Sequence, residues 1–325
     1  MCIRDRQFGP AMQTIAAQDG NPDFFMFGEV ALDGSGAAQK SFTSHYTTHD
    51  QMQAILDFPF QDAARGFASR GLGNQQLAQF FANDDWYTDA DSNVYELPAF
   101  LGNHDMGRIG RFLKVDNPGA DDAELLARDR LAHELMYFSR GNPVVYYGDE
   151  QGFTGNGGDQ LARQTMFASQ VPEYLGDDLI GTDRTHAQDN FVTDAPMYQT
   201  IRQLAEVTEQ HPALRNGAEQ TRYASSGPGV FAVSRIDRQH QKEYVVALNN
   251  SESTASAQVP TFIRKGTFRK VYGDGPAQLT TGSHGTLPVT LGGLSTAVYV
   301  SKGRIPRSSH APKISLGAPA PARPG

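Results

Sequence analysis

Four short apolar runs alternate with helix-like segments along the first half of the chain, and this order limits the fold more than any other feature. The runs cover residues 24–30, 53–58, 97–101 and 143–147. The first run, residues 24–30, is continuous rather than alternating, as in a strand that is buried on both faces of a parallel sheet. Strands that alternate with helices predict parallel βαβ units, so this part of the chain is predicted to be an α/β domain.

Helical patterns lie between and after these runs. Phe8, Met12 and Ile15 predict a helix over residues 8–17, and further helical stretches run through residue 81. Asp121 and Glu124 resemble a capping box that opens a helix, and Gly141 ends that helix. After a long loop, one more helix is predicted over residues 196–210.

From about residue 216 the pattern changes to short strands separated by Gly, Asn and Ser turns. With no helix-length pattern between them, they predict an all-β antiparallel sandwich over residues 216–302. Residues 303–325 are rich in Pro and Ala and are predicted to be a linker or disordered tail. Residues 7–215 then form the α/β domain, and we interpret residues 1–6 as a non-native or artefactual end, because they join abruptly to sequence typical of a domain interior.

Composition excludes several classes of partner. The net charge of −8 argues against nucleic acid and anionic membranes. No apolar run approaches the roughly 18 residues needed to cross a bilayer. Cys2 is the single cysteine, so no internal disulfide can form. The oligomeric state is left open.

Glu29 stands at the end of the first apolar run, directly after Gly28. It is not expected in the core, because a buried unpaired charge is costly. From its position alone, Glu29 is about equally well explained as a catalytic carboxylate and as a carboxylate in a solvated loop.

Asn103, His104 and Asp105 follow the third apolar run, where the carboxyl end of a parallel strand is expected. One alternative is that Asp105 caps the next helix, with Asn103 and His104 in the turn. A metal site is a weak alternative, because no second His lies at ligand spacing. Two carboxylates directed into one cleft suit sugar chemistry, in which one donates a proton and another stabilises positive charge. Asp149 and Glu150 follow the fourth run, and we interpret them as acids that brace a loop.

Five motifs, in order, resemble those of the α-amylase family, glycoside hydrolase family 13. Phe27-Gly28-Glu29-Val30 is similar to the strand-five motif of that family, and Leu56 to Phe60 resembles strand six. Residues 100–108, Phe-Leu-Gly-Asn-His-Asp-Met-Gly-Arg, resemble strand seven, and Tyr146 to Gly152 resembles strand eight. Residues 159–167 are similar to the segment after strand eight. The resemblance implies a partial (β/α)8 TIM barrel, strands five to eight, followed by the C-terminal β domain of the family.

The resemblance also implies roles for individual residues. Glu29 would be the general acid/base of a retaining glycoside hydrolase that acts on α-linked glucans such as starch. Asp105 would grip sugar hydroxyls and stabilise the oxocarbenium-like transition state. His104, Asn103 and Arg108 would bind or position the substrate.

One departure from the family governs what we expect of this chain. The family's nucleophilic Asp lies in a Gly-Phe-Arg-x-Asp motif before strand five, and no such motif occurs in the sequence. We therefore expect the chain to be inactive alone.

We expect no cofactor site in it, although calcium is common in the family. We favour an extracellular or periplasmic location, with the signal peptide lost upstream. A transglycosylase of the same family and a non-catalytic sugar-binding relative remain the alternatives.

Overall fold

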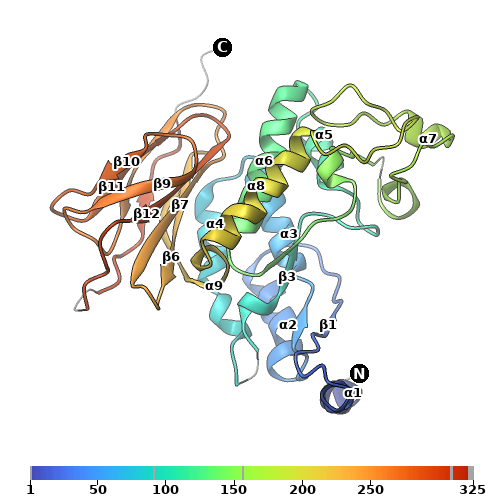
Figure 1. Cartoon of the computed structure of the whole chain (residues 1–325), viewed down its shortest axis with the longest axis horizontal. Helices are drawn as coiled ribbons and strands as arrows, with labels where there is room; N and C mark the ends of the chain where they lie inside the picture. Colours follow the sequence, from blue (N-terminus) through green and yellow to red (C-terminus); the bar gives the residue numbers. More distant parts are fainter. Residues whose placement is uncertain (1, 91, 156, 308–309, 321–325) are drawn as a thin grey trace.

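The molecule has a helical part and a β-sheet part that lie side by side along its longest axis, with helices α6 (Asp122–Phe138) and α8 (Pro196–Gln210) between them (Figure 1). The computed structural model describes residues 2–90, 92–155, 157–307 and 310–320. Residue 1 lies outside these ranges. Residues 2–6 belong to the first helix, so our interpretation of residues 1–6 as a non-native end stays a prediction.

Each of the four predicted apolar runs overlaps a strand, but each strand has only two or three residues. They are β1 (Phe27–Gly28), β2 (Ala54–Ile55), β3 (Pro98–Phe100) and β4 (Asn142–Val144). β1 pairs with β2 and β3 pairs with β4, both in parallel. The two pairs lie next to each other, because the amide of Asp57 donates to the carbonyl of Pro98 over 3.0 Å. The predicted parallel pairing is therefore confirmed within each pair.

Burial differs sharply between the inner and outer strands. Both residues of β2 and all three of β3 are buried. In contrast, Phe27 of β1 is 52% exposed and Val144 of β4 is 43% exposed. The prediction that the first run is buried on both faces is wrong, and β4 is exposed as well. The physical reason is that each has a strand neighbour on one side only among the described residues, so part of its apolar surface meets solvent.

The helices follow the sequence pattern closely where their caps are strong. The side chain of Asp121 accepts the amide of Glu124 over 2.9 Å, which confirms the predicted start of α6. α6 ends at Phe138, and Gly141, with φ of 99°, lies in the turn that leads into β4. α8 has the predicted bounds. The other helices are α1 (Cys2–Gln18), α2 (Ala37–Thr48), α3 (Phe58–Ala64), α4 (Asn74–Ala82), α5 (Ile109–Asp116), α7 (Pro172–Leu175) and α9 (Ala213–Asn216), with a π-helical turn η1 (Arg65–Ser69) after α3.

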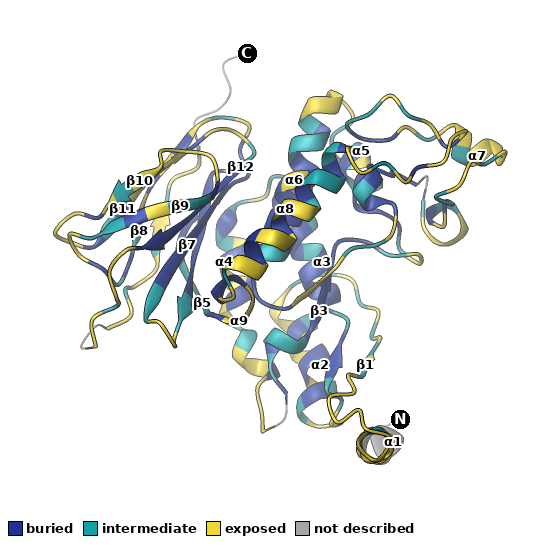
Figure 2. Ribbon diagram, viewed as in Figure 1, coloured by how far each residue is buried: buried dark blue, intermediate teal, exposed yellow. Residues whose placement is uncertain are grey.

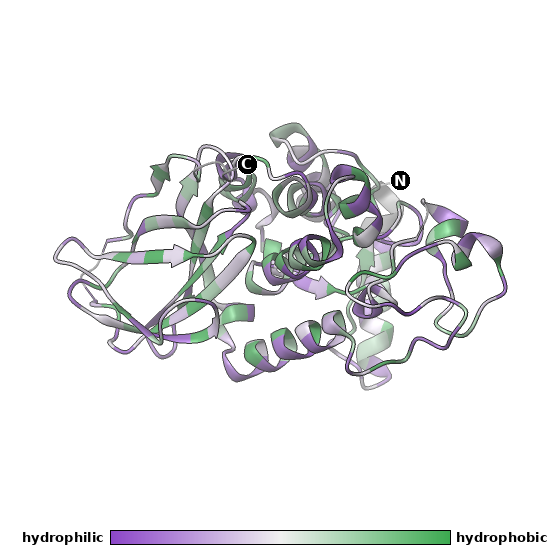
Figure 3. Cartoon of the chain, turned by 90° about the horizontal axis from the view of Figure 1, so that it is seen from above, coloured by the Kyte–Doolittle hydropathy of each residue, from purple (hydrophilic) through white to green (hydrophobic). Residues whose placement is uncertain are grey.

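The C-terminal part is a sandwich with one large and one small sheet. The large sheet has the order β10-β9-β12-β7-β6-β5-β13, and β11 pairs with β8. Their bounds are β5 Ala218–Ser225, β6 Val230–Asp237, β7 Lys242–Asn249, β8 Ala255–Pro260, β9 Thr267–Gly273, β10 Gln278–Thr280, β11 Thr286–Leu291, β12 Ser295–Ser301 and β13 Ser315–Gly317. The antiparallel sandwich is confirmed. Several of its strands carry hydrophobic and hydrophilic residues in alternation, as the view from above shows (Figure 3).

One face of the large sheet is continuous with the core of the helical part. Phe231 of β6 stacks on Phe81 of α4, with ring centroids 5.9 Å apart, and Tyr272 of β9 meets Phe138 of α6 at 5.0 Å. These residues belong to one buried cluster that also includes the apolar faces of α3 and α8. The other face of the large sheet packs on β8 and β11 around a second cluster. In Figure 2 the central strands of the large sheet are mostly buried, whereas α8 carries both buried and exposed residues.

The prediction that residues 303–325 form a linker or disordered tail is wrong for part of that segment. β13 lies within it and pairs in parallel with residues 223–225 of β5. The amide of Ser226 donates to the carbonyl of Gly317 over 2.7 Å, and the guanidinium of Arg222 donates to the carbonyl of Pro312 over 3.1 Å. The unpaired edge of β5 supplies backbone partners that a sequence pattern does not reveal. Residues 321–325 lie outside the described residues.

A buried carboxyl group links α6 to the large sheet. Glu134 accepts hydrogen bonds from the hydroxyl of Tyr272 over 2.7 Å and from the hydroxyl of Thr296 over 2.6 Å. Burial raises the pKa of Glu134 to about 7, against the hydrogen bonds, which lower it. The group therefore holds its proton near neutral pH, and ionisation leaves a charge inside the interface.

This raised pKa predicts that acid conditions favour the interface. Because the folded-state pKa lies above the unfolded value, the contribution is present below the unfolded pKa of about 4.5 and is lost as pH rises through about 7. Between about pH 5 and pH 8, the melting temperature of Glu134→Gln should fall less than that of the unmodified chain. The difference should correspond to a free energy of unfolding on the order of 2–3 kcal/mol. Thermal denaturation followed by circular dichroism measures this. Glu209→Gln, on the exposed face of α8, is the control. Equal pH slopes in all three proteins would contradict the assignment.

Candidate active site

A tight turn presents His104 and Asp105 just beyond the end of β3. The side-chain oxygen of Asn103 accepts the amides of Asp105 and Met106, both over 2.9 Å. Asn103 and Gly107 exchange backbone hydrogen bonds of 3.0 and 3.1 Å, which close the turn. Asn103 thus fixes the backbone, while the side chains of His104 and Asp105 are about half exposed.

The alternative in which Asp105 caps the next helix is wrong. The N-cap of α5 is Arg108, and no side-chain hydrogen bond caps that helix. Asp105 instead faces outward beside His104, with 3.4 Å between His104 Nε2 and Asp105 Oδ1. An exposed carboxylate next to an imidazole is available for a substrate, which a capping carboxylate is not.

A loop after β4 closes over Asp105. The guanidinium of Arg163 lies 3.3 Å from the Asp105 carboxylate and 3.0 Å from that of Asp159. The amide of Asp159 donates to the carbonyl of Asp105 over 3.2 Å. A Cβ added at Gly158 would lie 2.6 Å from that same carbonyl oxygen, so only glycine permits this approach. The family-like sequence of residues 159–167 does not reveal the contact of Arg163 with Asp105, because no spacing rule relates the two positions.

Arg108 does not lie on the accessible surface of this site. Its side chain is fully buried, and its guanidinium donates to the carbonyl of Tyr147 over 2.6 Å and to the carboxylate of Asp149 over 3.0 Å. The guanidinium also stacks over Tyr146, 4.3 Å from the ring centroid. From this position Arg108 does not reach a sugar, so the structure does not support its predicted role in binding substrate.

Buried ionisable groups gather beneath the turn. Burial raises the pKa of Asp149 to about 7, although the charge of Arg108 opposes this shift. On α6, His133 Nδ1 lies 3.1 Å from the carboxylate of Asp129; burial lowers the pKa of His133, but this hydrogen bond and charge raise it overall. The result is a buried cluster of ionisable groups behind an exposed acid.

Glu29 directly follows β1 and its side chain is exposed. An exposed carboxylate at a strand end agrees with both alternatives left open by the sequence. The structure thus brings together Asn103, His104 and Asp105 around one turn, while Glu29 arises from a different strand.

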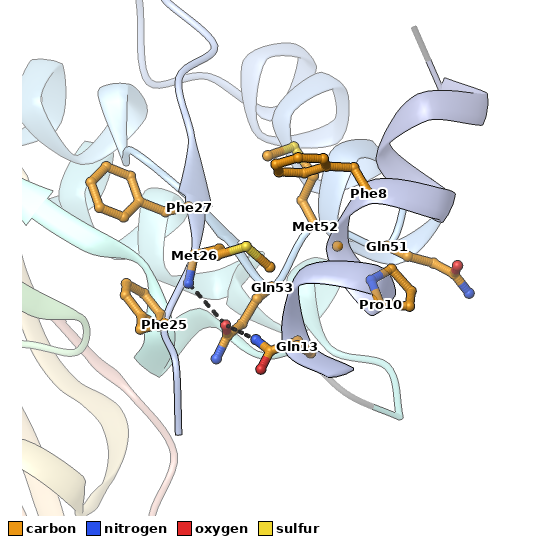
Figure 4. Close-up of a pocket in the computed structure, with 10 residues that line it drawn as sticks. Phe8, Pro10, Gln13, Phe25, Met26, Phe27, Gln51, Met52 and Gln53 are labelled. Carbon is orange, nitrogen blue, oxygen red and sulfur yellow. Dashed lines mark hydrogen bonds between the residues drawn. The ribbon is translucent and has the colours of Figure 1, made fainter. Parts of the chain in front are cut away.

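A pocket of about 750 Å³ lies at the other end of β1, between that strand and α1 (Figure 4). Phe8, Phe25, Phe27 and Met52 line it, and the side chain of Gln53 accepts the amide of Met26 over 3.1 Å. None of its lining residues is acidic, basic or His, so it lacks groups for proton transfer. The volume of this pocket is therefore no guide to the chemistry of the chain.

Within the described ranges, no group of three or more His, Cys, Asp or Glu side chains is arranged to hold a metal ion. Our expectation about cofactors stays a prediction. No described helix has the length and apolar character to cross a membrane.

Comparisons with known proteins bear on this site. A family model described as "Alpha amylase, catalytic domain" matches residues 3–217. A protein of Streptomyces lividans named "Alpha-amylase" is 50% identical over 319 residues, which are 98% of this chain and 34% of the relative. A cyclomaltodextrin glucanotransferase of Geobacillus stearothermophilus is 26% identical over 264 residues, 78% of this chain and 30% of the relative. The chain thus spans about a third of the length of these curated relatives.

Two solved structures show the same fold at low identity. An Anoxybacillus α-amylase superposes with a TM-score of 0.68 at 21% identity, covering 93% of this chain and 56% of the other. The α-amylase of Geobacillus thermoleovorans, solved with acarbose, gives a TM-score of 0.71 at 18% identity, covering 93% and 57%. Because both likenesses extend over nearly the whole chain, they include the helical part and the sandwich together.

The close approach at Gly158 yields a prediction. Gly158→Ala should destabilise the chain by about 1–3 kcal/mol, because the added methyl meets backbone that cannot rotate away. Gly119→Ala is the matched control, since a Cβ there has open space around it. Urea denaturation measures both free energies of unfolding. If the two variants were equally stable, the loop would not be seated on Asp105 as described.

Proposed function

Because the chain belongs to the α-amylase family, we propose that it supplies the general acid and the sugar-gripping carboxylate of a retaining glycoside hydrolase that acts on α-linked glucans. One observation carries the proposal. In a chain that matches this family, the turn closed by Asn103 and Gly107 presents His104 and Asp105 directly after a buried parallel strand. Polar side chains at the carboxyl ends of barrel strands are where enzymes of this architecture place their chemistry.

We propose further that β1 to β4 correspond to strands five to eight of a (β/α)8 barrel. Their order supports this, as does the exposure of Phe27 and Val144 on the two outer strands beside fully buried inner strands. In a closed barrel every strand has two neighbours. Further strands beside β1 and β4 would cover the apolar surface that these residues now expose.

The proposed chemistry divides the steps among three carboxylates. Glu29 protonates the oxygen of the leaving sugar and later removes a proton from the incoming water. Asp105 and His104 hold hydroxyls of the ring that becomes oxocarbenium-like. A nucleophile is needed to form the glycosyl-enzyme bond, and the sequence contains no Gly-Phe-Arg-x-Asp motif to supply it. We propose that it comes from a segment upstream of residue 7.

A transglycosylase is the second candidate, since one relative is named as a glucanotransferase. It would use the same carboxylates but pass the glycosyl group to another sugar instead of water. Chromatography of the products from maltoheptaose separates the two: hydrolysis gives only shorter maltodextrins, and transfer gives some longer or cyclic ones.

The missing nucleophile predicts that residues 1–325 alone do not hydrolyse soluble starch, whereas a form extended upstream through the Gly-Phe-Arg-x-Asp motif does. Reducing-sugar release measures both. The short form must first be shown to be folded by circular dichroism. Clear turnover by a folded short form would show that the nucleophile lies within this chain.

A second prediction tests Glu29. In the upstream-extended form, Glu29→Gln should lower kcat by about 10²–10⁴-fold, because the amide cannot donate the proton of a carboxylic acid. Binding of acarbose, measured by calorimetry, should persist. Glu173→Gln, another exposed glutamate, serves as the control. Near-normal turnover of the Glu29 variant would remove Glu29 from the mechanism.

A further inference from the structure

The turn that presents His104 and Asp105 is fixed by its own backbone, but its orientation depends on its two ends. One end continues from β3 at Phe100, and the other continues into Arg108 and α5. Since His104 and Asp105 are about half exposed, packing of their own side chains cannot hold the turn in place. The loop after β4 contacts Asp105 from one side through Gly158, Asp159 and Arg163, and Arg108 fixes the end of the turn that continues into α5.

Arg108 has the most restrictive surroundings near the turn. Its side chain is fully buried, donates to the carbonyl of Tyr147 and to the carboxylate of Asp149, and lies over the rings of Tyr146 and Phe153, 4.3 and 5.2 Å from their centroids. Its Nε and Nη2 have no hydrogen-bond partner among the described protein atoms. Asp149 is therefore the counter-charge on which this buried cation depends.

Asp149 is itself held by a rigid turn. It lies between Gly148 and Gly152, both with positive φ, and its amide donates to the carbonyl of Tyr146 over 3.1 Å. A Cβ at Gly148 would lie 2.5 Å from the ring of Phe153, and one at Gly152 would lie 2.3 Å from the carbonyl oxygen of Ile180. The backbone around Asp149 is thus packed too tightly to move independently.

We propose that Asp149 is a positioning residue, which fixes the turn of Asn103 to Gly107 through its buried ion pair with Arg108 and thereby aims Asp105 at the substrate. This inference rests on the proposed function for the meaning of Asp105, but the contact between the two loops stands without it. Both hydrogen bonds come from Nη1 of Arg108, so they fix that end of the guanidinium, while the rings of Tyr146 and Phe153 pack against the rest of the group. Catalytic groups need such support from neighbours that are themselves fixed.

A pair of substitutions separates positioning from stability. Arg108→Met and Asp149→Leu alone each leave a buried charge without its partner and should destabilise the chain strongly. The double variant Arg108→Met/Asp149→Leu removes both charges and should recover most of the lost melting temperature. It does not restore the hydrogen bonds that hold Arg108 to the loop after β4.

Amide hydrogen exchange on residues 1–325 then reports on the turn. In the double variant, the amides of Asn103 and Gly107 should exchange at least about tenfold faster than in the unmodified chain, while amides of β6 and β7 should not change. The control is Arg65→Met/Asp116→Leu, which removes another Arg–Asp pair, bonded at 2.8 Å. That control should leave exchange in the turn unchanged.

Turnover gives the second measurement. In the upstream-extended form, the Arg108/Asp149 double variant should lose about 10²-fold in kcat with a smaller change in KM, as misplacement of a catalytic group does. If the extended form has no turnover, the proposed function fails, and the exchange result alone still decides whether the pair positions the turn. The inference is overturned if the stable double variant keeps normal exchange at Asn103 and Gly107, or if the control changes them equally.

Discussion

The apolar face of the large sheet is the constraint on which the rest of the structure depends. Strands of two or three residues cannot hold a parallel sheet together by their own hydrogen bonds, and β1 to β4 are all this short. β3 and β4 contact α3 and α6, respectively, and these helices share one buried cluster with β6, β7, β9 and β12. Phe231 and Tyr272 therefore stabilise the positions of β3 and β4 indirectly, although both residues lie in the sandwich. β2 packs instead in a separate cluster with Tyr87, Val94 and Leu97.

Sequence patterns predicted the fold best where a local rule acts alone. Asp121 capped α6 as expected, and α8 has the predicted bounds because Pro196 starts it. The predicted burial of β1 was wrong, since a continuous apolar run does not reveal how many neighbours a strand has. β13 was missed for a related reason: its contacts with β5 are between backbone groups, and residues such as Ser315 and Gly317 give no strand pattern.

The candidate site was predicted in outline. Asn103, His104 and Asp105 come from one short motif, so their shared turn followed from the sequence. The ion pairs of Asp105 with Arg163 and of Arg108 with Asp149 join residues 58 and 41 positions apart. No periodicity relates such distant positions, and Arg108 in particular resembles a surface cation until its burial is known. The interpretation of Asp149 as an acid that braces a loop agrees with the structure, because its carboxylate contacts Arg108 on the adjoining loop.

The short strand β13 has a consequence for how the molecule meets its neighbours in solution. Without it, β5 would present a row of free amides and carbonyls at the border of a six-stranded sheet, and such borders recruit strands from other chains. The parallel contact of Ser315–Gly317 occupies this border, and Ala320 adds a further backbone bond of 2.6 Å to Pro228. A segment whose composition is typical of a linker thus covers the edge of the sheet, and a covered edge is not free to pair with a strand of another molecule.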